Sequence, residues 1–315
     1  MSSSTPSASL TIPMEGEGQR LDAFAAAALP TLLPSRTRAR KEAKAGRLLL
    51  DGAPAAPSAF LQAGQQLTLL PPPPPARPAI SIDIPVLYID PFFAAVHKPP
   101  GLLTNGNRHR TLERALPGVI PPSDAPDALP APLVVHRLDR PTSGLVLVAR
   151  TRRAQVSLGR QLEERTLEKL YRAIVCGPLK GAGEVTTPID GRAARTLWRA
   201  VSHTPSLKHG WLTVVALHPE TGRTHQLRRH LAGLGHPILG DLQHAPEAQL
   251  RGKGLFLFAA EVRLVHPITG APLHIVAPDP PKFAALLKRE ARRHARVSDS
   301  RHTPEASSGQ EGPTP

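Results

Sequence analysis

Asp139 is the residue whose type and surroundings best suit chemistry. It lies in the segment 136–144 (HRLDRPTSG), between apolar runs at 133–135 and 145–149 that we expect to be strands. A loop held between strands is fixed by the scaffold yet open on one side, as catalytic groups require. Neighbouring arginines favour the ionised form of a carboxylate, which can act as a nucleophile or a base. From these residues alone, a structural Arg–Asp pair in a turn is the alternative interpretation.

A second polar cluster lies at residues 221–230, with the sequence TGRTHQLRRH. Thr221 and Gly222 predict a turn, and a helix is expected to open at 223–226. The N–H groups at the start of a helix, with the cation of Arg223, would form an anion site. The anion would be a phosphate or another part of the protein, such as Asp139. A surface turn followed by a basic helix is the alternative, and the residues alone favour it.

Four histidines within twenty residues raise the question of a metal site: His225, His230, His236 and His244. No pair has the i, i+4 spacing that places two ligands on one helical face, and no cysteine is nearby. The chain also lacks a Walker loop, a GxGxxG motif after a strand and a GxSxG elbow. We therefore expect neither a metal nor a cofactor.

Tyr171 stands out because aromatic residues are scarce, with two Trp, two Tyr and seven Phe in 315 residues. It lies in a strand expected at 169–176. A tyrosine can stack on a nucleic-acid base, which contributes about 1–3 kcal/mol. Packing in a core or an interface is the more common use of such a residue.

The composition points to a polyanionic partner. Lysine and arginine outnumber the acidic residues by 39 to 25, which gives a net charge of +14, and nucleic acid is the commonest polyanion. The single Cys176 excludes an internal disulfide and fits a reducing cytoplasm. The sequence has no apolar run of about 18 residues and no secretory signal in its Ser-rich start. We therefore expect a basic cytoplasmic protein with no membrane partner.

A proline-rich stretch at 71–78 (PPPPPARP) divides the chain, because consecutive prolines favour an extended spacer. Low-complexity, polar ends complete the division. We expect disorder at 1–14, a small domain at 15–70, a linker at 71–83, a large domain at 84–290 and a disordered tail at 291–315.

The small domain carries a basic stripe on an expected helix. Ser35 is a suitable N-cap and Gly46 a suitable C-cap for this helix. Arg36, Arg40 and Lys44 recur every four residues, so they share one face. Such a stripe can follow the phosphates of a nucleic acid. A merely solvated face is the equally weighted alternative.

Five blocks of the large domain follow one another in a recognisable order. They are 98–101 (KPPG), 136–145 (HRLD and TSGL), 169–173 (KLYRA), 221–228 (TGRTHQLR) and 235–241 (GHPILGD). Together they resemble the RluA-type pseudouridine synthase family. The small domain resembles, through fewer residues, the alpha-L RNA-binding domain that many members carry. The resemblance implies an α+β fold with a mixed, largely antiparallel central sheet and flanking helices, preceded by a small α/β RNA-binding domain.

The resemblance also implies roles for particular residues. Asp139 would be the catalytic aspartate, Tyr171 would pack against the uracil, and Arg223 would pair with the aspartate. Arg137 would lie beside the flipped base. In the reaction the bond from sugar to ring nitrogen breaks, the uracil turns and a ring carbon is joined instead, without a cofactor. We expect further RNA contacts from His136, Arg140, Thr142, His225, Gln226, Arg228 and Lys98, and from Arg36, Arg40 and Lys44 of the small domain.

Two blocks depart from the family pattern. Members often carry a tyrosine shortly after the Gly-Asp of the last block, whereas here residues 242–244 are LQH. A Leu-His-Ala string is common where this chain has LFA at 257–259. Neither departure touches Asp139, Tyr171 or Arg223, so we still expect activity.

The prediction is an RNA pseudouridine synthase that modifies large-subunit ribosomal RNA. A tRNA pseudouridine synthase and a non-catalytic RNA-binding or ribosome-assembly protein are the alternatives. RNA is the expected partner, no obligate protein partner is implied, and a monomer is the default. Replacing Asp139 with asparagine separates an enzyme from a binder, because only an enzyme needs the carboxylate.

Overall fold

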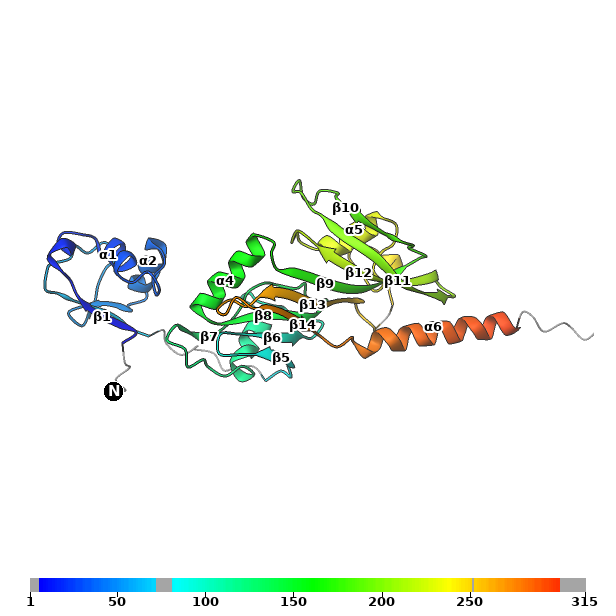
Figure 1. Ribbon diagram of the computed structural model, residues 1–315, viewed down its shortest axis with the longest axis horizontal. Helices are drawn as coiled ribbons and strands as arrows, with labels where there is room; N and C mark the ends of the chain where they lie inside the picture. The colour runs from blue at the N-terminus through cyan, green and yellow to red at the C-terminus, as the bar shows by residue number, and fades with distance from the viewer. Residues whose placement is uncertain (1–5, 72–80, 251, 301–315) are drawn as a thin grey trace, which may run out of the picture. The chain divides into compact units, whose positions relative to one another are not determined.

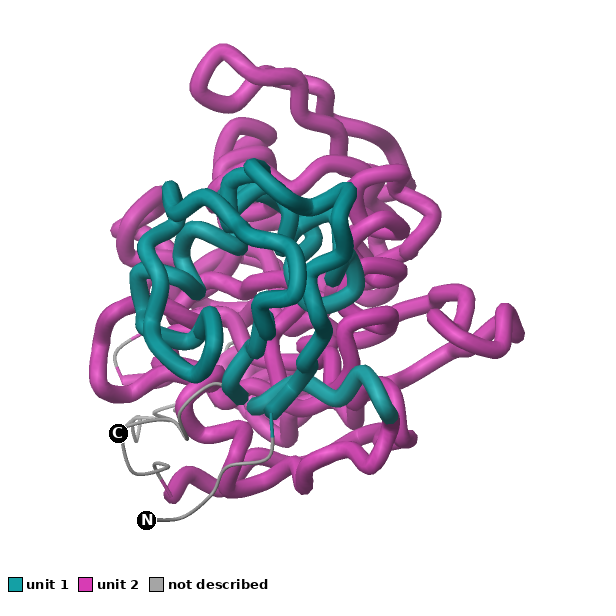
Figure 2. Tube along the Cα trace, turned by 90° about the vertical axis from the view of Figure 1, so that its left-hand side faces the viewer, with its two compact units in different colours: residues 1–78, 126–131 teal, residues 79–125, 132–315 magenta. Residues whose placement is uncertain are grey.

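The structure, a computed structural model, describes residues 6–71, 81–250 and 252–300 (Figure 1). Contacts between residues divide the chain into two compact units, which Figure 2 colours separately. Unit 1 comprises residues 1–78 and 126–131, and unit 2 comprises residues 79–125 and 132–315.

Unit 1 is built on a four-stranded antiparallel sheet with the strand order β1-β4-β2-β3. Leu21 and Phe24 of α1, together with Ala39 and Ala43 of α2, belong to one apolar core with side chains of the sheet. The elements are β1 (Ala8–Thr11), a 3-10 helix (Met14–Gly16), α1 (Leu21–Ala28), α2 (Arg36–Lys44), β2 (Leu48–Leu50), β3 (Ala53–Pro54) and β4 (Gln66–Leu69).

The start of the chain is more ordered than predicted. β1 pairs with β4, with Leu10 opposite Leu67, and Ile12 is buried in the core of unit 1. The prediction of disorder at 1–14 is therefore wrong for residues 8–11. Two apolar residues among Ser and Pro were too weak a signal for a strand. Residues 1–5, and most of the predicted linker at 71–83, lie outside the described residues.

Helix α2 begins where the sequence predicts. The Ser35 hydroxyl accepts a hydrogen bond from the backbone N–H of Arg38 at 3.2 Å. Arg36 and Arg40 donate to the carboxylate of Asp22, at 3.1 and 2.6 Å. Although burial alone would raise the pKa of Asp22, these hydrogen bonds lower it to about 2. Two members of the basic stripe therefore also hold α2 against α1.

Unit 2 is organised around one long sheet with the strand order β10-β11-β12-β9-β13-β8-β6-β5. Neighbours along this order are antiparallel except β13 and β8, which are parallel. The predicted α+β fold with a mixed, largely antiparallel sheet is confirmed. The strands are β5 (Val86–Ile89), β6 (Phe93–Lys98), β7 (Ala128–Val134, of which 128–131 belong to unit 1), β8 (Ser143–Thr151), β9 (Glu168–Cys176), β10 (Ala182–Val185), β11 (Thr196–Ser206), β12 (Gly210–Pro219), β13 (Leu257–Val265) and β14 (Pro272–Val276).

Helices and short 3-10 turns lie between these strands, and α6 follows the last of them. The helices are α3 (Leu112–Ala115), α4 (Arg152–Glu163), α5 (Gln226–Gly233) and α6 (Pro281–Ser300), and the 3-10 turns are Leu116–Gly118 and Pro246–Ala248.

β8 anchors the loop that contains Asp139, because every residue of this strand is buried. At its end, the Thr151 hydroxyl caps α4 by accepting the N–H of Ala154 at 3.3 Å. At its start, Gly144 has a φ of 117° and pairs with Ala259 of β13. A Cβ at residue 144 would lie 2.3 Å from the Ala259 carbonyl oxygen, so β13 can approach only a glycine here.

Helix α6 extends through the segment predicted to be a disordered tail. It runs from Pro281 to Ser300, so the prediction of disorder at 291–315 is wrong for residues 291–300. Phe283, Leu286 and Glu290 are its buried positions, and the Ser206 hydroxyl donates to Glu290 at 2.9 Å. Like the other helices of the described ranges, α6 is not apolar enough to cross a bilayer.

Candidate active site

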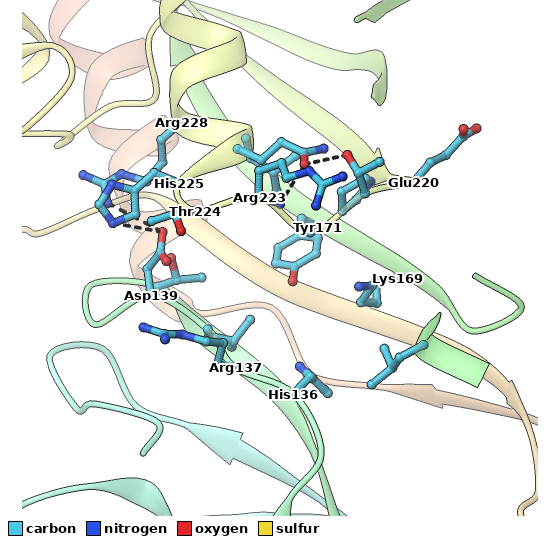
Figure 3. A pocket seen from close by; sticks show the side chains of 18 of the residues that line it. His136, Arg137, Asp139, Lys169, Tyr171, Glu220, Arg223, Thr224, His225 and Arg228 are labelled. Atoms are coloured by element: carbon cyan, nitrogen blue, oxygen red, sulfur yellow. Dashed lines mark hydrogen bonds and ion pairs between the residues drawn. The ribbon is translucent and has the colours of Figure 1, made fainter. Parts of the chain in front are cut away.

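Nine of the predicted site residues of unit 2 line one cavity of about 510 Å³ (Figure 3). The cavity is formed by the loop at 136–142, by β9, and by the turn between β12 and α5. Its volume is within the range of about 300–1,000 Å³ that is usual for sites that hold small ligands. The nine residues are His136, Arg137, Asp139, Thr142, Tyr171, Arg223, His225, Gln226 and Arg228.

Lys98 anchors the loop that contains Asp139 through hydrogen bonds to backbone carbonyl groups. Its ammonium group is fully buried and donates to three carbonyl oxygens, those of Pro99, Leu102 and Arg140, at 3.0, 2.9 and 3.3 Å. Burial lowers the pKa of Lys98 to about 8. The prediction that Lys98 contacts RNA is therefore wrong, because solvent cannot reach this side chain. It positions the loop instead.

Asp139 faces two groups of α5 and of the turn before it. Arg228 Nη1 lies 3.6 Å from its Oδ2, and His225 Nε2 lies 3.9 Å from the same oxygen. The predicted partner, Arg223, instead donates from Nε to the Ala193 carbonyl at 2.9 Å. The predicted Arg223–Asp139 pair is thus wrong. Because α5 begins only at Gln226, Arg223 belongs to the preceding turn and Arg228 to the buried face of the helix.

A buried ion pair fixes Arg228. Its Nε and Nη2 atoms donate to both oxygens of Asp241, at 2.8 and 2.7 Å, and both side chains are almost completely buried. The carboxylates of Asp241 and Asp139 raise the pKa of Arg228 against the opposing effect of burial. Two nitrogen atoms of its guanidinium group are thus bound to protein, but Arg228 also lines the cavity, so its contact with RNA stays a prediction. Arg228 lies on the buried face of α5, and this place on the helix was the feature of the sequence that could have indicated a carboxylate partner within the protein.

Gln226 shapes the turn that precedes α5. Its amide oxygen accepts from the Thr221 hydroxyl and the Arg223 N–H, at 2.7 and 3.0 Å. Its amide nitrogen donates to Arg195 O and Thr196 Oγ1, at 2.9 and 3.0 Å. Both donors and both acceptors of the amide are therefore in use. The prediction of an RNA contact from Gln226 is wrong, and its role is to hold the turn.

Tyr171 presents an aromatic ring to the cavity. It pairs with Leu217 of β12 and Ala259 of β13, and its side chain packs against two apolar clusters of unit 2. Burial, with the nearby charge of Asp139, raises the pKa of the phenol. The ring is therefore a neutral, rigid surface beside a carboxylate (Figure 3).

The remaining predicted residues differ in their surroundings. Arg137 lines the cavity and is exposed, so its guanidinium can meet a polyanion. Thr142 also lines the cavity, and its buried hydroxyl has no hydrogen-bond partner among the described residues. Arg140 is exposed but lies outside the cavity lining, with Nε bound to the Gly101 carbonyl at 3.1 Å. Arg36, Arg40 and Lys44 belong to unit 1 and do not line this cavity.

The cavity also contains charged residues that the sequence analysis did not assign to the site. Lys169 and Glu220 line it together with Glu163 and Arg165. Lys169 lies on the same strand as Tyr171, and burial lowers its pKa. Alternation along β9 places residues 169 and 171 on one face, and this was the signal for Lys169. The two glutamates carried no comparable signal.

The histidines of this region are bound to other protein groups. His230 contacts Thr196 Oγ1 and the Thr187 carbonyl, at 2.9 and 3.0 Å, and His236 contacts the Cys176 carbonyl at 3.0 Å. Within the described ranges, no three His, Cys, Asp or Glu side chains are grouped to hold a metal ion.

His136 is half-buried at the wall of the cavity, and its hydrogen bonding fits the neutral form. Its Nε2 accepts the N–H of Leu147 at 3.1 Å, which leaves the ring proton on Nδ1. Burial, with the charge of Lys169, lowers the pKa of His136 to about 3. In the unfolded chain this histidine binds a proton near about pH 6.5, whereas in the folded state it stays neutral at that pH. The neutral His136 therefore contributes fully to the free energy of unfolding above about pH 6.5, and this contribution is lost as the pH falls towards about 3.

We expect His136→Gln to flatten the acid dependence of folding. The glutamine amide has no comparable titration, so between about pH 5.5 and about pH 4.5 the variant should lose about 1.4 kcal/mol less stability than the wild type. Urea unfolding at several pH values measures this difference. His109→Gln, at an exposed position, is the matched control and should follow the wild type. Parallel curves for the His136 variant and the wild type would show that His136 is not held neutral in the folded state.

Known proteins are similar to this chain along most of its length. The RNA pseudouridylate synthase family matches residues 93–233. The ribosomal large subunit pseudouridine synthase D of Xylella fastidiosa is 35% identical over 304 residues, which cover 88% of this chain and 90% of that protein. The protein of the same name from Nitrosomonas europaea is 33% identical and covers 89% of this chain and 86% of that protein.

A solved structure agrees with the fold. Human RNA pseudouridylate synthase domain containing 1 matches with a TM-score of 0.55 and 25% identity, over 70% of this chain and 96% of that one. The matched segment 93–233 includes Asp139, Tyr171 and Arg228, which meet at the cavity. The chain therefore belongs to the RNA pseudouridine synthase family, of the RluA type, and is an isomerase of RNA uridines.

Proposed function

We propose that this protein forms pseudouridine in large-subunit ribosomal RNA and that Asp139 performs the chemistry. One observation carries the proposal. A carboxylate and a neutral aromatic ring share a cavity, and a buried arginine is fixed against the carboxylate. A target uridine that leaves its stack costs a few kcal/mol, and stacking on Tyr171 recovers part of that. The exposed Arg137 and the net charge of +14 supply attraction to the RNA backbone.

The reaction proceeds through the sugar carbon that carries the base. The Asp139 carboxylate either adds to C1′ or takes the proton at the 2′ position, and in both routes the bond between C1′ and uracil N1 breaks. The uracil turns while it is held against Tyr171. C1′ then bonds to uracil C5 as the bond from C1′ to the Asp139 carboxylate breaks or, in the other route, as the proton returns to the 2′ carbon. C5 loses its hydrogen as a proton, and N1 gains one. Reactant and product are isomers, so no redox partner is consumed.

The choice of ribosomal RNA rests on relatives. Proteins named for the large ribosomal subunit match this chain over 86–90% of their own length and over 88–89% of this chain, so the matches extend into unit 1. A tRNA substrate is the second candidate, since the cavity itself recognises a uridine rather than an RNA class.

Tritium release separates these substrates. Purified protein is incubated with large-subunit rRNA, small-subunit rRNA or tRNA that carries tritium at uracil C5. We expect release into water from large-subunit rRNA alone. Release from tRNA alone would overturn the substrate. RNA binding without release from any RNA, beside an active control enzyme, would favour the non-catalytic binder.

We propose that unit 1 is an alpha-L-type RNA-binding domain that uses the stripe on α2. Lys44 is its exposed member outside the Asp22 cluster. Lys44→Glu should weaken RNA binding and reduce the slope of log affinity against log salt by about 1. Lys180→Glu, at an exposed position of unit 2, makes the same charge change away from α2 and is the matched control with a smaller effect. Equal effects in the two variants would show that the stripe attracts RNA only through the net charge of the protein and not through a specific contact.

A further inference from the structure

His225 and His244 form a hydrogen-bonded pair beside Asp139. His225 Nδ1 and His244 Nε2 are 2.9 Å apart, and the rings meet edge to face at 74°. On its other side, His225 Nε2 lies 3.9 Å from Asp139 Oδ2. Residue 244 lies in the block where this chain departs from the family pattern.

Backbone geometry orients the imidazole rings of both His225 and His244. His225 has a φ of 55°, in the left-handed region that few side chains other than Asn, Asp and His adopt. The buried Asp241 carboxylate accepts the N–H groups of Gln243 and His244, at 3.1 and 3.2 Å. The same carboxylate holds Arg228. The ion pair that orients Arg228 thus also orients the loop that carries His244.

The contact between the two rings holds one proton, and its position decides what His225 presents to Asp139. If a neutral His225 carries the proton on Nδ1, a lone pair on Nε2 faces the carboxylate, which is repulsive. If His244 Nε2 carries it, His225 Nδ1 accepts, and the remaining His225 proton lies on Nε2 towards Asp139. A doubly protonated His225 donates to both neighbours. The favourable arrangements all place a proton on His225 Nε2.

We propose that His244 is a positioning residue that keeps a proton on His225 Nε2, directed at the carboxylate of Asp139. Both His225 and Arg228 approach Oδ2 of that carboxylate, so Oδ1 is the oxygen that the sugar can approach. The charged groups that face the pair are Asp139, Asp241, Arg228 and Arg229. Burial lowers the pKa of His244, which agrees with a neutral ring. The catalytic consequence rests on the proposed function.

Two aromatic variants that differ by one hydroxyl group test the proposal. His244→Phe removes the partner of Nδ1, whereas His244→Tyr restores a donor to it. We expect kcat for tritium release to fall about 10- to 100-fold in the Phe variant, as for other misplaced catalytic groups, and to recover in large part in the Tyr variant. RNA affinity should be equal in the two, because neither change alters the charge facing RNA at neutral pH.

Nitrogen NMR of protein with labelled histidine reads the proton position without any substrate. We expect the wild type and the Tyr variant to show His225 with Nε2 protonated and Nδ1 accepting, and the Phe variant to show a mixture. The signal is assigned with a His225→Asn variant. An unchanged His225 signal in the Phe variant would overturn the proposal whatever the activity. A changed signal with full kcat would overturn its catalytic part. If no RNA is a substrate of the wild type, the proposed function fails while the NMR result still decides the role of His244.

Discussion

The Asp139→Asn variant is expected to lose pseudouridine formation by at least about 10⁴-fold while keeping its affinity for RNA. The change replaces one oxygen with an amide nitrogen and leaves the shape of the loop. An amide cannot add to C1′ or accept the 2′ proton, and enzymes that lose the reacting group fall by comparable factors. Arg228 keeps its bidentate pair with Asp241, so the cavity should stay folded. Single-turnover tritium release and filter binding measure the two quantities.

A matched control for this variant is Asp190→Asn. Asp190 is an exposed carboxylate of unit 2 that pairs with Arg229 at 2.9 Å, and its loss should leave turnover close to the wild-type rate. Turnover by Asp139→Asn at a rate near that of the control would refute Asp139 as the catalytic group. A parallel loss of RNA binding in Asp139→Asn would point to a binding role instead.

Replacing Arg228 with methionine is expected to damage both folding and catalysis. Asp241 would keep a buried charge without its bidentate partner, which costs about 3–5 kcal/mol in comparable pairs. Asp139 would lose the arginine that pairs with it, so we expect kcat to fall by about 100-fold as well. Arg228→Lys should recover part of the stability, because a lysine keeps the charge but cannot form the fork. Urea unfolding and tritium release test the two effects separately.

Arg223→Met discriminates between the two arginines of this turn and helix. Arg223 donates from its side chain to the Ala193 carbonyl, so its replacement should cost only about 1 kcal/mol of stability. A stability loss in Arg223→Met equal to that in Arg228→Met would contradict the structural assignment. An intact Arg228→Met protein with normal kcat would show that Asp139 needs no fixed cation.

Local signals in the sequence predicted the local structure well. Ser35 was identified as a helix cap because hydroxyl side chains bind free N–H groups at helix starts, and its hydroxyl accepts the N–H of Arg38. The sheet class followed from the family resemblance rather than from periodicity. β1 was missed because its few apolar residues acquire partners only from β4, far along the chain. The last ten residues of α6 were missed because they are mostly charged and polar and carry few apolar residues.

At the site, too, the sequence predicted features that depend on residue type and missed features that depend on contacts between distant parts of the chain. The sequence identified Asp139 and Tyr171, whose types alone suit the chemistry, and both line the cavity. It paired the wrong arginine with Asp139, because the start of α5 decides which arginine faces inward. It also assigned Lys98 and Gln226 to RNA, since their hydrogen bonds to distant backbone groups cannot be read from spacing.

Mapping pseudouridines in cells tests the central claim most directly. Ribosomal and transfer RNA are compared from cells that lack this gene and carry either a wild-type copy or an Asp139→Asn copy. We predict that one or a few large-subunit rRNA sites are pseudouridine with the wild-type copy and uridine with the Asp139→Asn copy, at equal protein levels. Modification of the same sites by both copies would contradict the account, because it would separate the reaction from the carboxylate on which the site is built.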